Sequence, residues 1–296
     1  GLILLLGVFR PDPARAGEAG TGLTFLSLGV SARRLGMGEA YIAVPDDPSS
    51  MHFNPAALSL VDHTALSLMH REWIQDTDIE YIAGGAKFNK FALGFSVYYV
   101  SIPDIEIRSV PGPPVGTFSA RNAALGLSAA YDVSEALAIG ATAKYVYEKI
   151  LVDDAGGMVF DIGGVYSTPH GIRLGLSLLN LGSISALRYE SSTPPRSFRG
   201  GASYTGELSS FPAVLTASMD VISPLEEGSS HVHVGGEAKL YETIAIRIGY
   251  QTGYDARDIT LGTGFTTGIV TVDYAFVPTR YDLGSTHAFS LTLAFR

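Results

Sequence analysis

Apolar and polar residues alternate one by one over long stretches of this chain, most clearly over 231–240 and 243–251. The two stretches are joined at Tyr241-Glu242, and neighbours such as Ile246 and Arg247 fall on opposite faces. Because successive side chains of a strand point to opposite faces, one face of this hairpin is apolar and the other is small, polar or charged. Unbroken alternation over about ten residues is typical of strands that cross an outer membrane.

The same alternation recurs along the chain and predicts fourteen strands. Single-chain bacterial barrels have an even number of strands. We therefore expect an all-β protein, a 14-stranded antiparallel transmembrane β-barrel formed by residues 63–296. The predicted strands are 63–71, 79–88, 91–101, 121–131, 136–148, 158–167, 172–180, 198–205, 213–221, 231–240, 243–251, 258–265, 269–277 and 286–295.

The connections between these strands alternate between long and short. One set, which includes 102–120 and 181–197, is long and rich in proline, aspartate and serine, whereas the other set, which includes Asn89-Lys90 and Tyr241-Glu242, is mostly tight turns. Outer-membrane barrels have short periplasmic turns and longer extracellular loops. The pattern therefore predicts a protein of the bacterial outer membrane with both termini in the periplasm.

The first 62 residues lack this strand pattern. Gly1–Phe9 is an apolar run too short to span a membrane, and Ala14-Arg15-Ala16 fits the small-x-small cleavage rule. We interpret residues 1–16 as a truncated secretory signal peptide. Residues 17–62 are then expected to form a plug, or hatch, inside the barrel.

The centre of the expected plug is Pro45–Leu60, where prolines interrupt any regular strand. Asn54 precedes Pro55, so it is predicted to cap a short helix that begins at Pro55 and continues through Ala56. Asn54, Pro55 and Ala56 are our candidate plug motif. Two roles remain open for it, a local folding device and a gate for a ligand path.

The composition is consistent with a barrel and argues against two other classes of protein. The chain is 46% hydrophobic, has 34 glycines and no cysteine, and carries a formal net charge of −9. Small residues are expected where strands face a crowded lumen. An acidic chain without a basic patch argues against nucleic acid as a partner. No segment approaches 18 consecutive apolar residues, which excludes a helical membrane protein.

The predicted inward face carries charges of both signs. With the paired Arg33 and Arg34 ahead of the plug, these charges predict a lumen joined by ion pairs rather than a wide aqueous channel. The alternative for the two arginines is a turn and a short helix. The candidate polar network is Arg33, Arg34, Lys144, Glu148, Arg173, Glu237, Lys239, Arg247 and Asp273, and Asp161, Arg199, Asp220 and Asp258 share the inward face.

The sequence gives little support for metal binding or for catalysis. His231 and His233 point to the same side of one strand, but only Glu237 has matching spacing, so we expect no metal. The sequence contains neither a GxSxG nor an HExxH motif. We expect a protein that is not an enzyme and uses no cofactor.

A resemblance to known families rests on the segment before the barrel. Asn54-Pro55-Ala56 ahead of fourteen strands resembles the FadL-type transporters of hydrophobic compounds. The longer pattern is more similar to the PorV/PorQ family of FadL-like outer-membrane proteins, which is associated with type IX secretion. The matching residues are Ala32-Arg33-Arg34, Gly36-Met37-Gly38-Glu39-Ala40, Asp46-Asp47 and Asn54-Pro55-Ala56-Ala57-Leu58.

Two functions follow as expectations from the resemblance. The first is a non-enzymatic component of type IX secretion, with secreted cargo proteins or secretion-system components as partners. The alternative is a FadL-like transporter that moves hydrophobic small molecules across the outer membrane. The extracellular connections are mostly polar and rich in proline and glycine, which favours the first.

Overall fold

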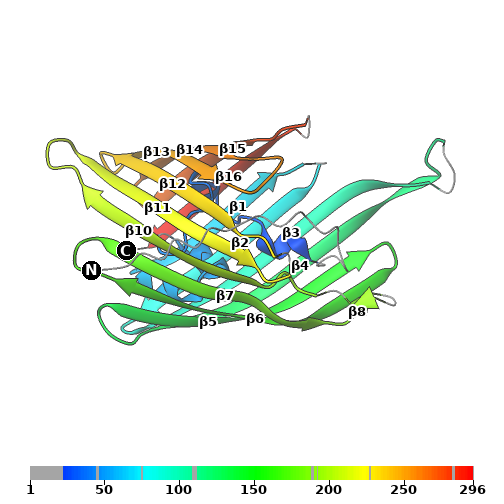
Figure 1. Cartoon of the computed structure of the whole chain (residues 1–296), viewed down its shortest axis with the longest axis horizontal. Helices are drawn as coiled ribbons and strands as arrows, with labels where there is room; N and C mark the ends of the chain where they lie inside the picture. The colour runs from blue at the N-terminus through cyan, green and yellow to red at the C-terminus, as the bar shows by residue number, and fades with distance from the viewer. Residues whose placement is uncertain are drawn as a thin grey trace.

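Fourteen antiparallel strands close into a barrel, in which β1 pairs with both β2 and β16 (Figure 1). The structure is a computed structural model that describes residues 23–44, 47–74, 76–108, 112–187, 190–191, 193–226, 228–281 and 284–295. The predicted signal peptide, residues 1–16, lies outside the described residues. The barrel strands are β1 Thr64–Glu72, β2 Asp78–Phe88, β3 Phe91–Ile107, β4 Gly116–Asp132, β5 Leu137–Ile150, β6 Asp153–Ser167, β7 Ile172–Ile184, β10 Ser197–Glu207, β11 Ala213–Pro224, β12 His231–Leu240, β13 Ile244–Gln251, β14 Ile259–Thr267, β15 Val270–Pro278 and β16 Ser285–Phe295.

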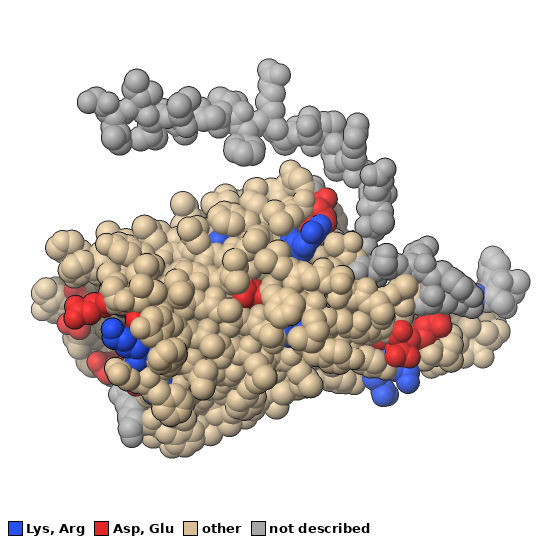
Figure 2. All heavy atoms as spheres, turned by 90° about the horizontal axis from the view of Figure 1, so that it is seen from below, with Lys and Arg blue, Asp and Glu red and all other residues tan. Residues whose placement is uncertain are grey.

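Each of the fourteen predicted strands corresponds to one barrel strand, so the predicted fold is confirmed. The predicted orientation of the side chains is also observed on β13. Ile246 is 58% exposed on the outside of this strand, while Arg247 is buried in the lumen. On the face shown in Figure 2, charged side chains gather mainly toward the ends of the barrel, and most of the wall between them is uncharged. Among the described residues, no helix is long and apolar enough to span a bilayer.

The wall is tallest at β3 and β4, which extend well beyond most of the other strands (Figure 1). Here the sequence prediction was wrong, because much of the connection predicted at 102–120 is strand. The pairing shifts between Ile102 and Ile105 at a β-bulge that contains Pro103 and Asp104. A bulge accommodates a proline and a left-handed residue such as Asp104, with φ 51°, without ending the strand. The connection after β7 also contains a two-stranded sheet of β8 Ala186–Leu187 and β9 Glu190–Ser191.

The described part of the N-terminal region, residues 23–44 and 47–62, lies inside the barrel, and we call it the inner segment (Figure 1). Its helices are short: η1 Thr24–Ser27, α1 Ala32–Gly36, η2 Pro48–His52 and η3 Pro55–Leu60. Nearly all of its residues are buried. Little of the segment is regular, so most of its backbone polar groups need partners outside their own helices.

The strands supply many of these partners, in their order around the wall. The amide of Ala32 donates to Ser290 on β16, and the carbonyl of Gly36 accepts from Thr260 on β14. Farther along the segment, carbonyl groups accept from Gln251 on β13, Ser218 on β11, Ser203 on β10 and Ser177 on β7. Leu58 of η3 then packs beside β2 and β3. The inner segment therefore follows the wall around the lumen.

Inward-facing glycines let the inner segment approach the strands closely. A Cβ atom at Gly249 would lie 2.0 Å from the amide nitrogen of Gly38, and one at Gly140 would lie 2.5 Å from that of Ala56. A side chain at either position would displace the backbone that packs against it. The strand glycines that contact the inner segment in this way are Gly85, Gly94, Gly140, Gly163, Gly175, Gly201, Gly235, Gly249 and Gly262.

We predict that Gly249→Ala destabilises the protein by about 1–3 kcal/mol, because the new methyl group overpacks the contact with Gly38. The matched control is Gly236→Ala on the neighbouring strand, where the nearest atom to the new Cβ is 3.9 Å away. The control should stay within about 0.5 kcal/mol of wild type. Denaturant unfolding of the detergent-purified protein measures both values. Equal effects would show that the inner segment does not pack against β13 in this way.

Candidate functional site

An ion network joins the inner segment to three strands. Arg33 of α1 donates to both carboxylate oxygens of Glu237 on β12, at 2.8 and 2.6 Å. Arg247 on β13 donates to Glu237 at 2.5 Å and lies 2.8 Å from Asp273 on β15. Two cations and two carboxylates thus share a largely buried site. The sequence placed these four residues in the lumen, and the structure brings them together.

The other residues of the candidate network lie apart from this site. Lys144 forms a second cluster, in which its ammonium lies 2.8 Å from Asp161 and donates to Asn180 at 2.6 Å. Arg34 donates to the carbonyl of Ser49 within the inner segment and lies over the ring of Tyr41. Among the ion pairs between described residues, none includes Glu148, Arg173 or Lys239.

The cluster around Lys144 lies at a second irregularity of the wall. The pairing of β6 with β7 shifts next to Asp161, and Asn180 has a left-handed φ of 59°. The amide of Asn180 donates to the carboxylate of Asp161 at 2.8 Å. This buried carboxylate therefore stabilises the irregular backbone beside it.

Asn54 joins three parts of the molecule. Its side-chain oxygen accepts from the amide of Ala56 at 3.1 Å, which caps η3, and Pro55 is the first residue of that helix. Its side-chain nitrogen donates to the carbonyl of Ile42 at 3.0 Å and to that of Gly164 on β6 at 3.2 Å. The local helix is the one that the sequence predicts, and the two other bonds connect it to the wall and to the preceding chain.

Asp220 on β11 is a further attachment point. One of its carboxylate oxygens accepts from the amides of Tyr41 and Ile42, at 2.5 and 2.9 Å. The sequence placed Asp220 on the inward face, but no local pattern indicates that it binds backbone. This carboxylate holds the middle of the inner segment against the wall.

A hydrophobic cluster lies between the inner segment and β1–β7, beside the buried polar cluster around Lys144. Seven hydrophobic residues of the inner segment, including Phe25 and Leu58, form one cluster with inward residues of these strands. The rings of Phe25, His52, Tyr81 and Tyr98 are in contact, with centroids 5.2 to 5.7 Å apart. Burial, together with the charges of Lys144, Arg199 and Arg34, holds the pKa of His52 well below its usual value, so this ring is neutral.

Along β10–β16 most of the inward-facing side chains are polar or small. They provide the hydroxyl bonds and the ion network described above. The buried polar residues on these strands include Ser203, Ser218, Asp220, Glu237, Arg247, Thr260, Asp273 and Ser290. The inner segment thus has most of its polar anchors on β10–β16, with others on β6 and β7, and its hydrophobic packing along β1–β7.

His231 and His233 lie next to each other at one end of β12, but their partner is a tyrosine. The ring of His231 stacks on Tyr254 with centroids 4.2 Å apart, and His233 hydrogen-bonds to the Tyr254 hydroxyl at 3.1 Å. Within the described residues, no group of three or more histidine, aspartate or glutamate side chains is arranged to hold a metal ion.

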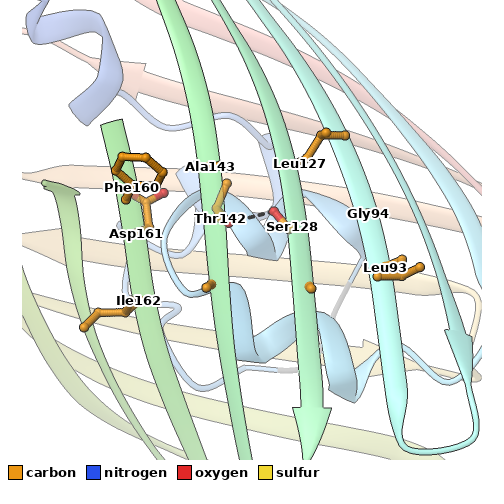
Figure 3. Close-up of a pocket in the computed structure, with 11 residues that line it drawn as sticks. Leu93, Gly94, Leu127, Ser128, Thr142, Ala143, Phe160, Asp161 and Ile162 are labelled. Atoms are coloured by element: carbon orange, nitrogen blue, oxygen red, sulfur yellow. Dashed lines mark hydrogen bonds between the residues drawn. The ribbon is translucent and has the colours of Figure 1, made fainter. Parts of the chain in front are cut away.

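A groove of about 540 Å³ lies on the outside of the wall, over β3–β6. Its floor includes Ala129 and Ala141, and Figure 3 shows Leu127 on one side and Phe160 and Ile162 on the other. These bulky side chains are about half exposed or more. The groove therefore belongs to the outward-facing apolar surface and not to the lumen.

Known proteins are similar to this chain in fold and, over part of its length, in sequence. The sequence profile of an uncharacterised protein family (UPF0164) matches residues 16–159. A comparison with curated proteins finds no match. Among solved structures, the CymD monoaromatic hydrocarbon channel aligns with a TM-score of 0.62 and 14% identity, covering 94% of this chain and 99% of CymD.

Two further structures belong to the same group. The Pseudomonas putida toluene transporter TodX aligns with a TM-score of 0.63 and 12% identity over 90% of this chain and 97% of its own. A Pseudomonas aeruginosa FadL homologue aligns with a TM-score of 0.52 and 13% identity over 90% of this chain and 98% of its own. The chain has the fold of FadL-like outer-membrane channels. This fold accounts for the FadL part of the resemblance, whereas none of these matches supports the PorV/PorQ assignment or a link to type IX secretion.

The ion network predicts unequal effects for two neighbouring substitutions. Arg247→Ile removes the cation that lies between two buried carboxylates and should cost about 3–5 kcal/mol. Ile246→Arg places a charge on the lipid side and should cost about 2–4 kcal/mol. The control is Arg280→Ile in an exposed ion pair with Asp258, which should cost at most about 1 kcal/mol. Unfolding midpoints in detergent compare the three. An Arg247→Ile variant with the unfolding midpoint of the wild type would show that the network does not stabilise the barrel.

Asn54→Ala should cost about 1–3 kcal/mol, because it removes a helix cap and leaves a buried and a part-buried carbonyl group without this donor. Its effect on transport separates the two roles of the plug motif. If the motif only stabilises the fold, transport by the folded mutant stays normal. A gate residue would instead change transport under conditions in which the mutant remains fully folded.

Proposed function

We propose that this protein is a passive channel for hydrophobic small molecules across the bacterial outer membrane, with the inner segment as its gate. The proposal extends to this chain what is known of its structural neighbours, which are named as a toluene transporter and a monoaromatic hydrocarbon channel. The fold shared with these neighbours supports a place in the outer membrane. The lumen of this chain supports hydrophobic small molecules as the transported compounds.

The observation that carries the proposal is the hydrophobic cluster between the inner segment and β1–β7. A water-filled pore needs a polar lining, and the interiors of porins are polar. Here, instead, a cluster of buried hydrophobic residues with contacting aromatic rings lies between the inner segment and β1–β7, beside the buried charges of Lys144 and Asp161. An apolar molecule that moves between the inner segment and β1–β7 stays in contact with apolar surface.

The apolar surface continues upward along the tall part of the wall. Val100 on β3 belongs to the buried cluster, and Ile102 follows it on the same face. The bulge then shifts the alternation by one residue, so Ile105 pairs with Phe118 on this face. Both side chains are partly exposed. They offer a half-open apolar surface on which a hydrophobic compound can approach the lumen.

We propose that the tall end of the barrel faces the outside of the cell. The short turns, such as Asn89-Lys90, and both ends of the chain then face the periplasm, as is usual for bacterial barrels. In this proposal the protein is a conduit and not an enzyme, and it needs no cofactor. No contact described here favours secreted proteins or secretion components as partners.

Uptake of radiolabelled toluene at low concentration tests the proposal. Cells or proteoliposomes with the protein should take up the compound faster than matched samples without it. Equal rates would overturn the proposed function.

The gate is tested with a disulfide that ties the inner segment to the wall, in a chain that has no cysteine of its own. Ser203 on β10 donates to the carbonyl of Ala43 at 2.9 Å, so Ala43→Cys with Ser203→Cys introduces two thiols beside this contact. The control is Ser67→Cys with Thr292→Cys, which ties β1 to β16, where the two hydroxyls lie 3.2 Å apart. Oxidation should slow uptake only with the first pair, and reduction should restore it. Full uptake with the first disulfide closed would show that the inner segment is not the gate.

A further inference from the structure

Two cations lie side by side on the outside of the barrel, toward its tall end. Arg121 on β4 is directly opposite Lys149 on β5, and both side chains are exposed. They belong to the outward face, because they alternate in step with the exposed Leu127 and Tyr145. Among the paired strand residues that the structure describes, no other position sets two lysine or arginine side chains opposite each other.

Neither cation has an anionic partner within the described part of the chain. The ion pairs between described residues include neither Arg121 nor Lys149. Asp154 on β6 is opposite Lys149, yet it too forms no ion pair. Like charges directly opposite each other on neighbouring strands are destabilising. The arrangement therefore costs stability unless an anion from outside the protein neutralises it.

The two cations can reach the same anion. The Cβ atoms of directly opposite residues on antiparallel strands are about 4.5–5.5 Å apart. The long side chains of Arg121 and Lys149 can therefore converge on a single phosphate group, which both residue types bind well. With Asp154 included, this row of three charges keeps one net positive charge.

The residues beside the cations indicate their height in the membrane. Tyr147 on β5 and Tyr99 on β3 lie in the next outward row toward the short turns, with Ala123 of β4 between them. Tyrosine rings prefer the interface between the hydrocarbon and the headgroups. Arg121 and Lys149 lie one row beyond these rings, and hence at the height of the lipid headgroups.

The outer groove over β3–β6 lies on the same strands, nearer the short turns (Figure 3). Ala143 is part of its floor and is directly opposite Leu127 on one side and Phe160 on the other. From Lys149 to Ala143 the strand runs roughly 20 Å, which is roughly 15 Å of depth for a strand tilted by about 40°. One leaflet of the hydrocarbon core is about 15 Å thick. A lipid with its headgroup at the cations can therefore place a chain in the groove.

We propose that this face of the barrel binds an anionic lipid with a phosphate in its headgroup. Arg121 and Lys149 hold the phosphate, and one acyl chain lies in the groove between Leu127 and Phe160. The groove selects a lipid over a free phosphate ion, because a free ion gains nothing from an apolar surface. The site is on the outside of the wall. It rests neither on transport through the lumen nor on which end of the barrel faces the outside of the cell.

Native mass spectrometry of the detergent-purified full-length protein tests the proposal, with phosphatidylglycerol as the probe and phosphatidylcholine as the comparison. The wild type should bind phosphatidylglycerol more tightly. Arg121→Gln and Lys149→Gln should each weaken this binding about fivefold, the usual effect of one basic residue at an anionic lipid surface, and together about thirtyfold. The control Arg280→Gln, in an exposed ion pair with Asp258, should bind like the wild type.

A second variant tests the groove without changing a charge. Ala141→Phe places a ring on the groove floor and should weaken phosphatidylglycerol binding about tenfold, equivalent to the loss of contact with roughly two methylene groups. The matched control is Ile248→Phe, an exposed position on β13 outside the groove, which should leave the binding unchanged.

The charge variants should fold, because each removes a contact between like charges. Their thermal midpoints in neutral detergent should equal or exceed that of the wild type. Equal binding of the two lipids by the wild type would overturn the proposal, as would unchanged binding of phosphatidylglycerol by the double variant. Competition by inorganic phosphate, with unchanged lipid binding in Ala141→Phe, would identify a site for free phosphate instead.

Discussion

The need of buried backbone groups for hydrogen bonds dominates this structure. The inner segment has only short helices, so most of its amides and carbonyls cannot bond within their own elements. Inward-facing side chains of the strands replace the missing partners. Ser203 and Ser218 donate to carbonyls, and the Asp220 carboxylate accepts two amides. The glycines of the wall bring the two backbones close enough for these bonds to form.

The charges in the lumen serve two different purposes. Arg33, Glu237, Arg247 and Asp273 balance one another and connect α1 to the wall. Lys144 and Asp161 form a separate pair, and the same carboxylate accepts the amide of Asn180 at the irregular pairing of β6 with β7. A buried network in which the charges are paired stabilises one arrangement of the chain. The first network therefore fixes the inner segment to the wall, whereas the second stabilises the wall itself.

The sequence predicted the barrel because apolar and polar residues alternate with a period of two, and this pattern recurs in each strand. Ile246 and Arg247 were assigned to the correct faces from their neighbours alone. The bulge at Pro103 and Asp104 was missed, because proline and aspartate are as typical of loops as of bulges.

The sequence predicted the lumen less completely. Alternation shows that Glu148, Arg173 and Lys239 face inward, but it does not show at what height or beside which strand they lie. Contacts between segments far apart in the chain, such as that of Arg71 with Gly29, leave no periodic signal. Arg71 shares the inward face of β1 with Ser67 and Met69. A charge at such a position was the one indication in the sequence that Arg71 is buried in the lumen.

The path of the inner segment has a consequence for the order of folding. Ala32 is near the beginning of the described chain, yet it bonds to Ser290, 258 residues later. The segment emerges first during synthesis, but its partners are complete only when β16 has joined β1. Closing such long loops is slow, because the chain loses entropy before the contacts form. The part of the protein that is made first is therefore among the last to reach its native contacts, and until then its unbonded backbone needs water or a chaperone.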